Sequence, residues 1–251
     1  IGIETYVATR KHTDKDPAKD KNRFHLILLA MNNTGYQNLM RLSTIANLDG
    51  FYYFPRIDHD LLEKYNEGLI VLSACMGGEV GNALKDDNVK KAEEIASWYK
   101  GIFGDRYYLE VQDHGHPKNP LHSIEQEEIN KKVMKLADKL DIPLVVTSDA
   151  HYLKHEDQDA HEILLCVGTG SFLADEKRMS LKDYPLHVED PEVIIERWGD
   201  YRPDAIANTK KVADRCEVDI ELGKILIPKF PVPSGETEQS YLTKLVYEGL
   251  R

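Results

Sequence analysis

The fold class is set by one stretch of sequence, Ile142-Pro143-Leu144-Val145-Val146-Thr147-Ser148-Asp149-Ala150-His151, in which an apolar run leads directly into two potential metal ligands. The short apolar run predicts a buried strand over 142–147. Asp149 and His151 are two positions apart at its end, so both side chains can point to the same side. A carboxylate and an imidazole on one rigid element suit a divalent metal. The alternative interpretation is that Asp149 caps a following helix and His151 lies on the surface.

The same alternation of short apolar runs and amphipathic stretches extends back toward the N-terminus. Strands are predicted over 24–30, 69–72 and 107–111, and helices over 35–47, 88–102 and 123–140, with Asn88 and Ser123 as the N-caps of the last two. Strands that alternate with helices predict βαβ units and a mainly parallel sheet, either open or closed into a barrel. In such sheets the chemistry lies on loops beyond the carboxyl ends of the strands.

Three further residues are candidate ligands because of their places in this pattern. Glu4 stands at a predicted strand end, His25 lies within an apolar strand, and Cys75 lies between a strand and a Gly-Gly turn. Taken singly, each has an ordinary explanation: an exposed carboxylate, a hydrogen-bonded core imidazole, and a small apolar filler. Together with Asp149 and His151, all of them fall at or in predicted strands. They could therefore jointly form a multi-metal site at one mouth of a barrel.

Two polar stretches are not taken as sites. One is a further cluster of possible ligands, Glu110, Gln112, Asp113, His114 and His116, because His114-Gly115-His116-Pro117 resembles a loop more than a site. The other is the charged segment 11–22, which is interpreted as a solvated loop and nothing more.

Composition and motif content narrow the function classes. The chain has 251 residues and a formal net charge of -11, which argues against a surface that binds a phosphate backbone through bulk electrostatics. A nucleic-acid substrate stays possible, because bound metal ions can hold one scissile phosphate. The sequence contains no glycine-rich phosphate loop of the Walker or Rossmann type, no GxSxG and no HExxH motif.

Cysteine usage and hydropathy indicate the compartment. The three cysteines, Cys75, Cys166 and Cys216, form no CxxC pair, which fits a reducing cytoplasm rather than a disulfide framework. No apolar run approaches the roughly 18 residues of a membrane span. We therefore expect a cytoplasmic protein without a membrane partner.

The two ends of the chain predict a segment of a longer protein. The chain opens like a strand entered midway, without an initiator Met, and the apolar spacing over 240–251 is typical of a helix that has just begun. Residues 227–235 form a Pro-rich connector of the kind that links domains. We predict one domain over 1–222 and, over 223–251, a linker with the start of the next domain.

Four stretches of the chain resemble one known family. These stretches are residues 1–7, residues 25–39, Leu72-Ser73-Ala74-Cys75-Met76-Gly77-Gly78-Glu79, and Thr147-Ser148-Asp149-Ala150-His151-Tyr152-Leu153. At these spacings they are similar to the PHP (polymerase and histidinol phosphatase) domain of the bacterial DNA polymerase III alpha subunit. The segment around 228–231 and the final helix resemble that subunit's passage into its polymerase part.

The resemblance implies an α/β fold and a metal site. The fold would be a distorted (β/α)7-type barrel followed by the start of a polymerase domain. The implied site is trinuclear, with Zn, Mn or Fe held by Glu4, His25, Cys75, Asp149 and His151, and with Asp149 and His151 also in the catalytic role. The family's HxH motif and a second Asp-His motif, which belong upstream of Glu4, are absent from this sequence. The site in this segment is therefore expected to be incomplete.

The resemblance also implies the function. The parent protein would be a DNA-directed DNA polymerase whose PHP domain is a metal-dependent 3′-5′ exonuclease that proofreads new DNA. DNA, the sliding clamp and other replicase subunits would be its partners. One alternative is a non-catalytic module that stabilises the polymerase or docks a separate proofreading exonuclease. A lesser alternative is a free-standing PHP phosphoesterase, against which the Pro-rich exit into a new helix argues.

Overall fold

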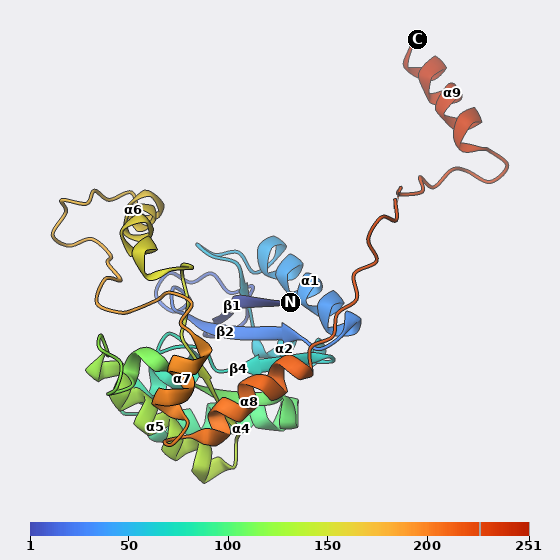
Figure 1. The fold of residues 1–251 in the computed structure, drawn as a ribbon. Coiled ribbons are helices and arrows are strands. Elements are labelled where there is room, and N and C mark those ends of the chain that lie inside the picture. The colour runs from blue at the N-terminus through green and yellow to red at the C-terminus, as the bar shows by residue number, and fades with distance from the viewer. Residues whose placement is uncertain (226, 251) are drawn as a thin grey trace. The chain divides into compact units, whose positions relative to one another are not determined.

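A computed structural model describes residues 1–225 and 227–250. The chain divides into two compact units, residues 1–219 and residues 220–251 (Figure 1). The boundary at residue 222, drawn from the sequence between a metal-binding domain and a following one, stays a prediction. None of the helices in the described ranges is long and apolar enough to cross a membrane.

The first unit is built on one mixed sheet of six strands. They are β1 (Gly2–Ala8), β2 (Arg23–Ala30), β3 (Arg56–Ile57), β4 (Leu69–Leu72), β5 (Tyr107–Gln112) and β6 (Leu144–Thr147), in the order β3-β1-β2-β4-β5-β6. β2 pairs antiparallel with both β1 and β4, whereas the pairs β1–β3, β4–β5 and β5–β6 are parallel. Five strands therefore share one direction and β2 alone is reversed.

The α/β class expected from the sequence is confirmed. The sheet itself ends at β3 on one side and at β6 on the other, so within the described residues it is an open six-stranded sheet. The barrel of about seven strands that the resemblance implied would need further pairing between those two edges. The reversal of β2 follows from the segment between β1 and β2, which contains no helix to return the chain for a parallel pairing.

Helices pack on both faces of the sheet. The helices of this unit are α1 (Asn33–Leu48), α2 (His59–Lys64), α3 (Glu79–Lys85), α4 (Val89–Phe103), α5 (Ile124–Leu140), α6 (Gln158–Thr169), α7 (Pro191–Trp198) and α8 (Pro203–Asp214). Of these, α1, α3, α4 and α5 lie on one face and α8 on the other. The predicted N-caps are confirmed: Asn88 Oδ1 accepts from the Lys91 backbone N–H, and Ser123 Oγ accepts from that of Gln126. These two caps fix where α4 and α5 begin.

Alternation along the strands separates two apolar layers. The larger core contains Val71, Leu109 and Val146, together with buried residues of α1, α3, α4 and α5. The intervening positions of the same strands face the other way and pack with Val212 of α8 in a smaller cluster, whose strand members are Ile70, Leu72, Tyr108 and Val145. Because successive strand residues alternate, Glu110 and Gln112 lie on the same face as Tyr108.

The segment 11–22 is a largely exposed loop, as expected, but it is also held by a buried side chain, which the sequence interpretation did not foresee. Arg56 is 1% exposed, and its guanidinium donates to the backbone carbonyls of Gly50, Asp20, His12 and Asp14. Three of these carbonyls belong to the charged segment, which is therefore fixed to the sheet edge at β3. The sequence could not show this, because the contacts are made by backbone oxygens.

The second unit contains α9 (Glu238–Gly249), which begins at its N-cap Thr237. The Phe230 ring of the Pro-rich connector lies against the ring of Tyr241, with centroids 6.2 Å apart. The helix predicted over 240–251 is confirmed in its position, although Arg251 lies outside the described residues.

Candidate functional site

One pocket of the first unit gathers all five residues singled out from the sequence. Its volume is about 290 Å³. The potential metal ligands in its lining are Glu4, His25, Cys75, Asp149, His151 and, in addition, His114. The remaining lining residues are Met76, Gly77, Gln112, Gln126, Met179, Leu181, Tyr184 and Leu186.

Sheet register explains the meeting of the N-terminal ligands. Glu4 is opposite Ile27, and Ile27 is opposite Leu72, the last residue of β4. The β1–β2 ribbon thus extends past the carboxyl end of β4. His25 is two positions from Ile27 on that ribbon, so it shares a face with Glu4 as a diagonal neighbour. Cys75 lies three residues after the end of β4 and completes this side of the pocket.

Glu4, His25 and Cys75 contact one another. His25 Nδ1 lies 2.5 Å from Glu4 Oε1 and 3.7 Å from Cys75 Sγ. The hydrogen bonds to Cys75 and then to Glu4 outweigh burial and raise the pKa of His25 to about 10. Tyr6 supports the imidazole edge-on at 5.3 Å between ring centroids. The ring is therefore held between an acid and a thiol.

Asp149 and His151 form the opposite side. Asp149 Oδ1 lies 3.6 Å from His151 Nε2. Burial is the largest single effect on Asp149 and opposes its ionisation, but the contact with His151 and the nearby imidazoles of His114 and His25 together outweigh it and lower the pKa of the carboxyl. The contact with Asp149 in turn raises the pKa of His151. Asp149 has a φ of 47°, in the left-handed region that strains most residues.

Asp149 does not serve as a helix cap. The N-cap residue of α6 is Asp157, and Lys154 precedes the short 3-10 turn before it. The structural alternative considered for Asp149 is thus wrong, and its side chain lines the pocket instead.

Glu110 lies two positions before the pocket residue Gln112, within a stretch predicted from the sequence as a strand. It is on β5, is 7% exposed, and accepts from Thr147 Oγ1 at 2.5 Å. Burial raises the pKa of this carboxyl to about 7. Its second oxygen, Oε2, has no partner among the described residues.

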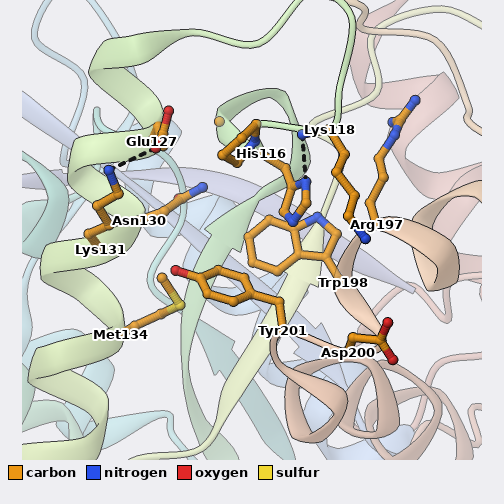
Figure 2. Close-up of a pocket in the computed structure, with 12 residues that line it drawn as sticks. His116, Lys118, Glu127, Asn130, Lys131, Met134, Arg197, Trp198, Asp200 and Tyr201 are labelled. Atoms are coloured by element: carbon orange, nitrogen blue, oxygen red, sulfur yellow. Dashed lines mark hydrogen bonds and ion pairs between the residues drawn. The ribbon is translucent and has the colours of Figure 1, made fainter.

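His114 is the site residue that the sequence interpretation missed. The segment Asp113–Gly115 is a short 3-10 turn after β5. It directs His114 into the pocket with the candidate ligands, whereas His116 lines a separate pocket of about 420 Å³. Figure 2 shows that second pocket, where His116 lies by Trp198 and Tyr201. The period-two alternation of β5 could have indicated that Glu110 and Gln112 share one face of the sheet. No such signal was available for His114, because the sequence His-Gly-His-Pro resembles an ordinary turn.

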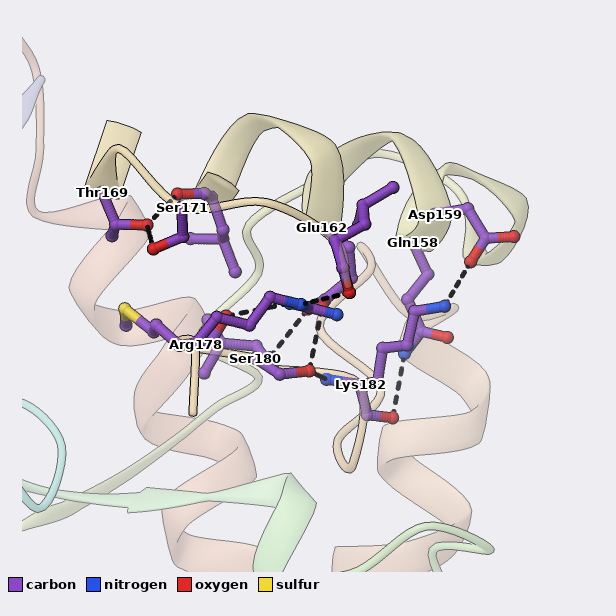
Figure 3. Close-up of polar contacts among 12 residues, drawn as sticks. Gln158, Asp159, Glu162, Thr169, Ser171, Arg178, Ser180 and Lys182 are labelled. Carbon is purple, nitrogen blue, oxygen red and sulfur yellow. Dashed lines mark hydrogen bonds and ion pairs between the residues drawn. The ribbon is translucent and has the colours of Figure 1, made fainter. Parts of the chain in front are cut away.

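One wall of the site belongs to the segment that follows α6. Glu162 of α6 is 1% exposed and accepts from Arg178 Nη1 at 2.6 Å, from Ser180 Oγ at 2.8 Å and from the Leu181 backbone N–H at 2.8 Å (Figure 3). These bonds lower the pKa of Glu162 to about 2 against the opposing effect of burial. They fix the segment that brings Met179 and Leu181 to the pocket.

The donor set suits a transition metal in its chemistry, because carboxylate, imidazole and thiolate groups share one pocket. In this arrangement the candidate metal ligands contact one another: Glu4 and Cys75 contact His25, and Asp149 contacts His151. Across residues 1–225 and 227–250, no three acidic, His or Cys side chains are spaced to hold an ion. Ligation would require His25 Nδ1 and Glu4 Oε1 to exchange their mutual hydrogen bond for the metal.

The mixed, mainly parallel sheet with its helices is consistent with a PHP-type fold. Residues 1–114 match the PHP domain family.

The chain is also similar over its full length to DNA polymerase III subunit alpha of several bacteria. It is 38% identical to that of Borreliella burgdorferi, 38% to that of Thermus aquaticus and 39% to that of Treponema pallidum. In each case 100% of the chain is covered, but only 21%, 20% and 21% of the relative. The chain is thus homologous to the PHP region of DNA polymerase III subunit alpha and spans about a fifth of these relatives.

Proposed function

We propose that this chain is part of a replicative DNA polymerase and that its pocket is a metal-dependent 3′-5′ exonuclease site that proofreads new DNA. The observation that carries the proposal is the meeting of Glu4, His25, Cys75, Asp149 and His151 in one pocket. Relatives named DNA polymerase III subunit alpha, similar across the whole chain, support the assignment to a polymerase. DNA and other replicase subunits would be the partners, including a sliding clamp, and the cytoplasm the compartment.

Each side chain has a place in the proposed chemistry. Glu4, His25 and Cys75 would hold metal on one side of the pocket, and Asp149 with His151 on the other. Divalent Zn, Mn or Fe ions, when bound, would polarise the scissile phosphodiester and make water a stronger nucleophile. Water adds to phosphorus, and the 3′ oxygen of the penultimate nucleotide leaves with a proton. A 5′-mononucleotide is released.

A second candidate function is a structural module without nuclease activity, which would stabilise the polymerase or dock a separate proofreading exonuclease. One observation favours it: the candidate metal ligands contact each other in pairs, and among the described residues no three acidic, His or Cys side chains are spaced to hold a metal ion. The two candidates differ in metal content and in nuclease activity.

Metal analysis and the substitution Asp149→Asn separate these candidates in the full-length protein. We expect about three divalent ions per chain, as in the proposed trinuclear site, and degradation of single-stranded DNA from its 3′ end. Asp149→Asn should abolish that degradation and leave DNA synthesis intact. The matched control is Asp86→Asn, because Asp86 is exposed at the end of α3.

Two results would contradict the nuclease proposal. A pure, folded protein without bound metal would leave only the structural module. Equal loss of synthesis and degradation in Asp149→Asn would assign the residue to folding.

A further inference from the structure

A row of aromatic side chains leads from the candidate metal pocket toward the β3 edge of the sheet. Tyr6 is directly opposite His25 in the β1–β2 pairing, and on its other side it is opposite Arg56 of β3. The Tyr6 ring lies 5.3 Å from the imidazole of His25 and 5.4 Å from the ring of Phe54, between centroids. Two ring-to-ring contacts therefore connect a pocket residue with Phe54, which precedes β3 by two positions.

Arg23 lies beside the outer part of this row. It is two positions before His25 on β2, so the two side chains share one face of the sheet. The guanidinium carbon of Arg23 is 3.6 Å from the centroid of the Phe54 ring and 4.8 Å from that of the Tyr6 ring. Both contacts are cation–π interactions, which fix the guanidinium beside the two rings. We call Tyr6, Arg23 and Phe54 together the Arg23 platform.

The positive charge of Arg23 is not neutralised by a neighbour. Among the described residues its guanidinium lies over two rings but forms an ion pair with no carboxylate, whereas Arg10 pairs with Asp20. Of its three nitrogens only Nε is buried without a partner, so Nη1 and Nη2 stay accessible to solvent. In a chain with a formal net charge of -11, an accessible and unpaired guanidinium is suited to an anionic ligand.

The turn before β3 keeps large rings exposed next to this guanidinium. The Tyr52 backbone N–H donates to the Phe54 carbonyl at 3.0 Å, and Tyr53 between them has a φ of 60°. Bulky residues rarely adopt this left-handed conformation, so the turn is strained. Phe54 is 38% exposed and Tyr53 is 62% exposed. The turn thus presents aromatic surface to solvent within reach of Arg23.

Exposed rings beside an unpaired arginine match the chemistry of single-stranded DNA. Every base has a π face that can stack on an aromatic ring, whatever the sequence. The phosphate oxygens of the strand accept charge-assisted hydrogen bonds from a guanidinium. In a duplex the bases are already stacked on each other, so this surface favours a single strand.

We propose that the Arg23 platform binds single-stranded DNA, with a base stacked on Phe54 and the neighbouring phosphate bound by Nη1 and Nη2 of Arg23. This inference rests on the proposed nuclease function, because it assigns the surface along which the strand reaches the pocket. The three residues of the Arg23 platform are binding residues and take no part in bond cleavage.

Binding of two labelled octamers to the 251-residue chain tests the proposal without catalysis. One octamer is octathymidylate, and the other has the same sugar–phosphate backbone without bases. Affinities are measured by fluorescence anisotropy in the presence of a chelator, so bound metal does not contribute. We expect the wild-type chain to prefer octathymidylate by about tenfold, within the range for one base stacked on an aromatic ring.

Two substitutions separate stacking from charge. Phe54→Leu keeps an apolar side chain but removes the ring, so octathymidylate should bind about tenfold more weakly with the same salt dependence. Arg23→Gln removes one phosphate contact, so the slope of log K against log salt concentration should become shallower by about 0.7. The matched controls are the exposed residues Phe172, changed to Leu, and Arg41, changed to Gln, and neither should alter the affinity or the slope measurably.

Three results would overturn the inference. Equal affinity of the wild-type chain for the two octamers would show that no base stacks on the platform, and this comparison needs no variant to fold. Unchanged affinity in Phe54→Leu together with an unchanged slope in Arg23→Gln would assign binding to another surface. Failure to bind either octamer at low salt would also refute it. The proposed nuclease function is judged separately by metal content and DNA degradation of the full-length protein, which could persist in all three cases.

Discussion

Replacement of Glu110 by Gln should make the folded chain more stable at high pH and change little at low pH. Glu110 is buried on β5, and burial raises the pKa of its carboxyl from 4.5 to about 7. A neutral amide of the same shape keeps the oxygen that accepts from Thr147 Oγ1. It removes only the capacity to ionise.

The sign and size follow from the two pKa values. Below pH 4.5 the carboxyl is protonated in both states and its titration has no effect on stability. Between pH 4.5 and about 7 the unfolded chain releases the proton and the folded chain retains it, so stability falls as pH rises. Above that range the loss is constant at about 3 kcal/mol, since each pKa unit corresponds to about 1.4 kcal/mol.

Urea denaturation of both proteins at pH 5 and pH 8, in the presence of a chelator, measures the effect. We expect the variant to gain less than about 1 kcal/mol over wild type at pH 5 and about 3 kcal/mol at pH 8. Glu125→Gln is the control, because Glu125 is half exposed in the first turn of α5. The same difference at both pH values would refute the reasoning, since it would show that ionisation of Glu110 is not penalised.

Three further predictions concern the segments that the side chains of Arg56 and Glu162 fix. Arg56→Met should lower the free energy of unfolding by about 3 kcal/mol or more, because four backbone carbonyls lose a buried cationic donor. Urea denaturation beside exposed Arg41→Met measures this, and equal losses in the two variants would contradict it. Glu162→Gln should make trypsin cleave after Arg178 about tenfold faster at pH 7, because the carboxylate that fixes this segment is lost. Glu156→Gln on the exposed turn before α6 is the control, and an unchanged cleavage rate would show that Glu162 does not hold the segment. The contribution of ionised Glu162 to stability should itself decline as the pH falls from 4.5 toward about 2.

Much of the local structure was predictable from the sequence, because periodicity and capping are local properties. The strand over 69–72 has the predicted bounds, and α4 begins after its predicted cap Asn88. The reversal of β2 was not predicted. The helix-free connection over 9–22 is a sequence signal for it, since parallel neighbours need a crossover.

The candidate site was predictable in part. Asp149 and His151 were found because a strand runs directly into them, and Glu4, His25 and Cys75 because they fall on or beside strands. Their meeting in one pocket depends on cross-strand register, which local patterns do not specify. His114 was missed for another reason: a 3-10 turn sends it and His116 into different pockets, and that separation depends on packing.

The place of β5 in the sheet has a consequence for handling the protein. All six residues of β5 are buried, and β6 pairs with it on one side. A polypeptide that stops at residue 114 would end just after β5 and would lack both β6 and the covering helix α5. It would present an unpaired apolar edge, which is a template for association with other chains. Soluble fragments should therefore extend beyond β6, even though the stretch matched to the family ends at residue 114.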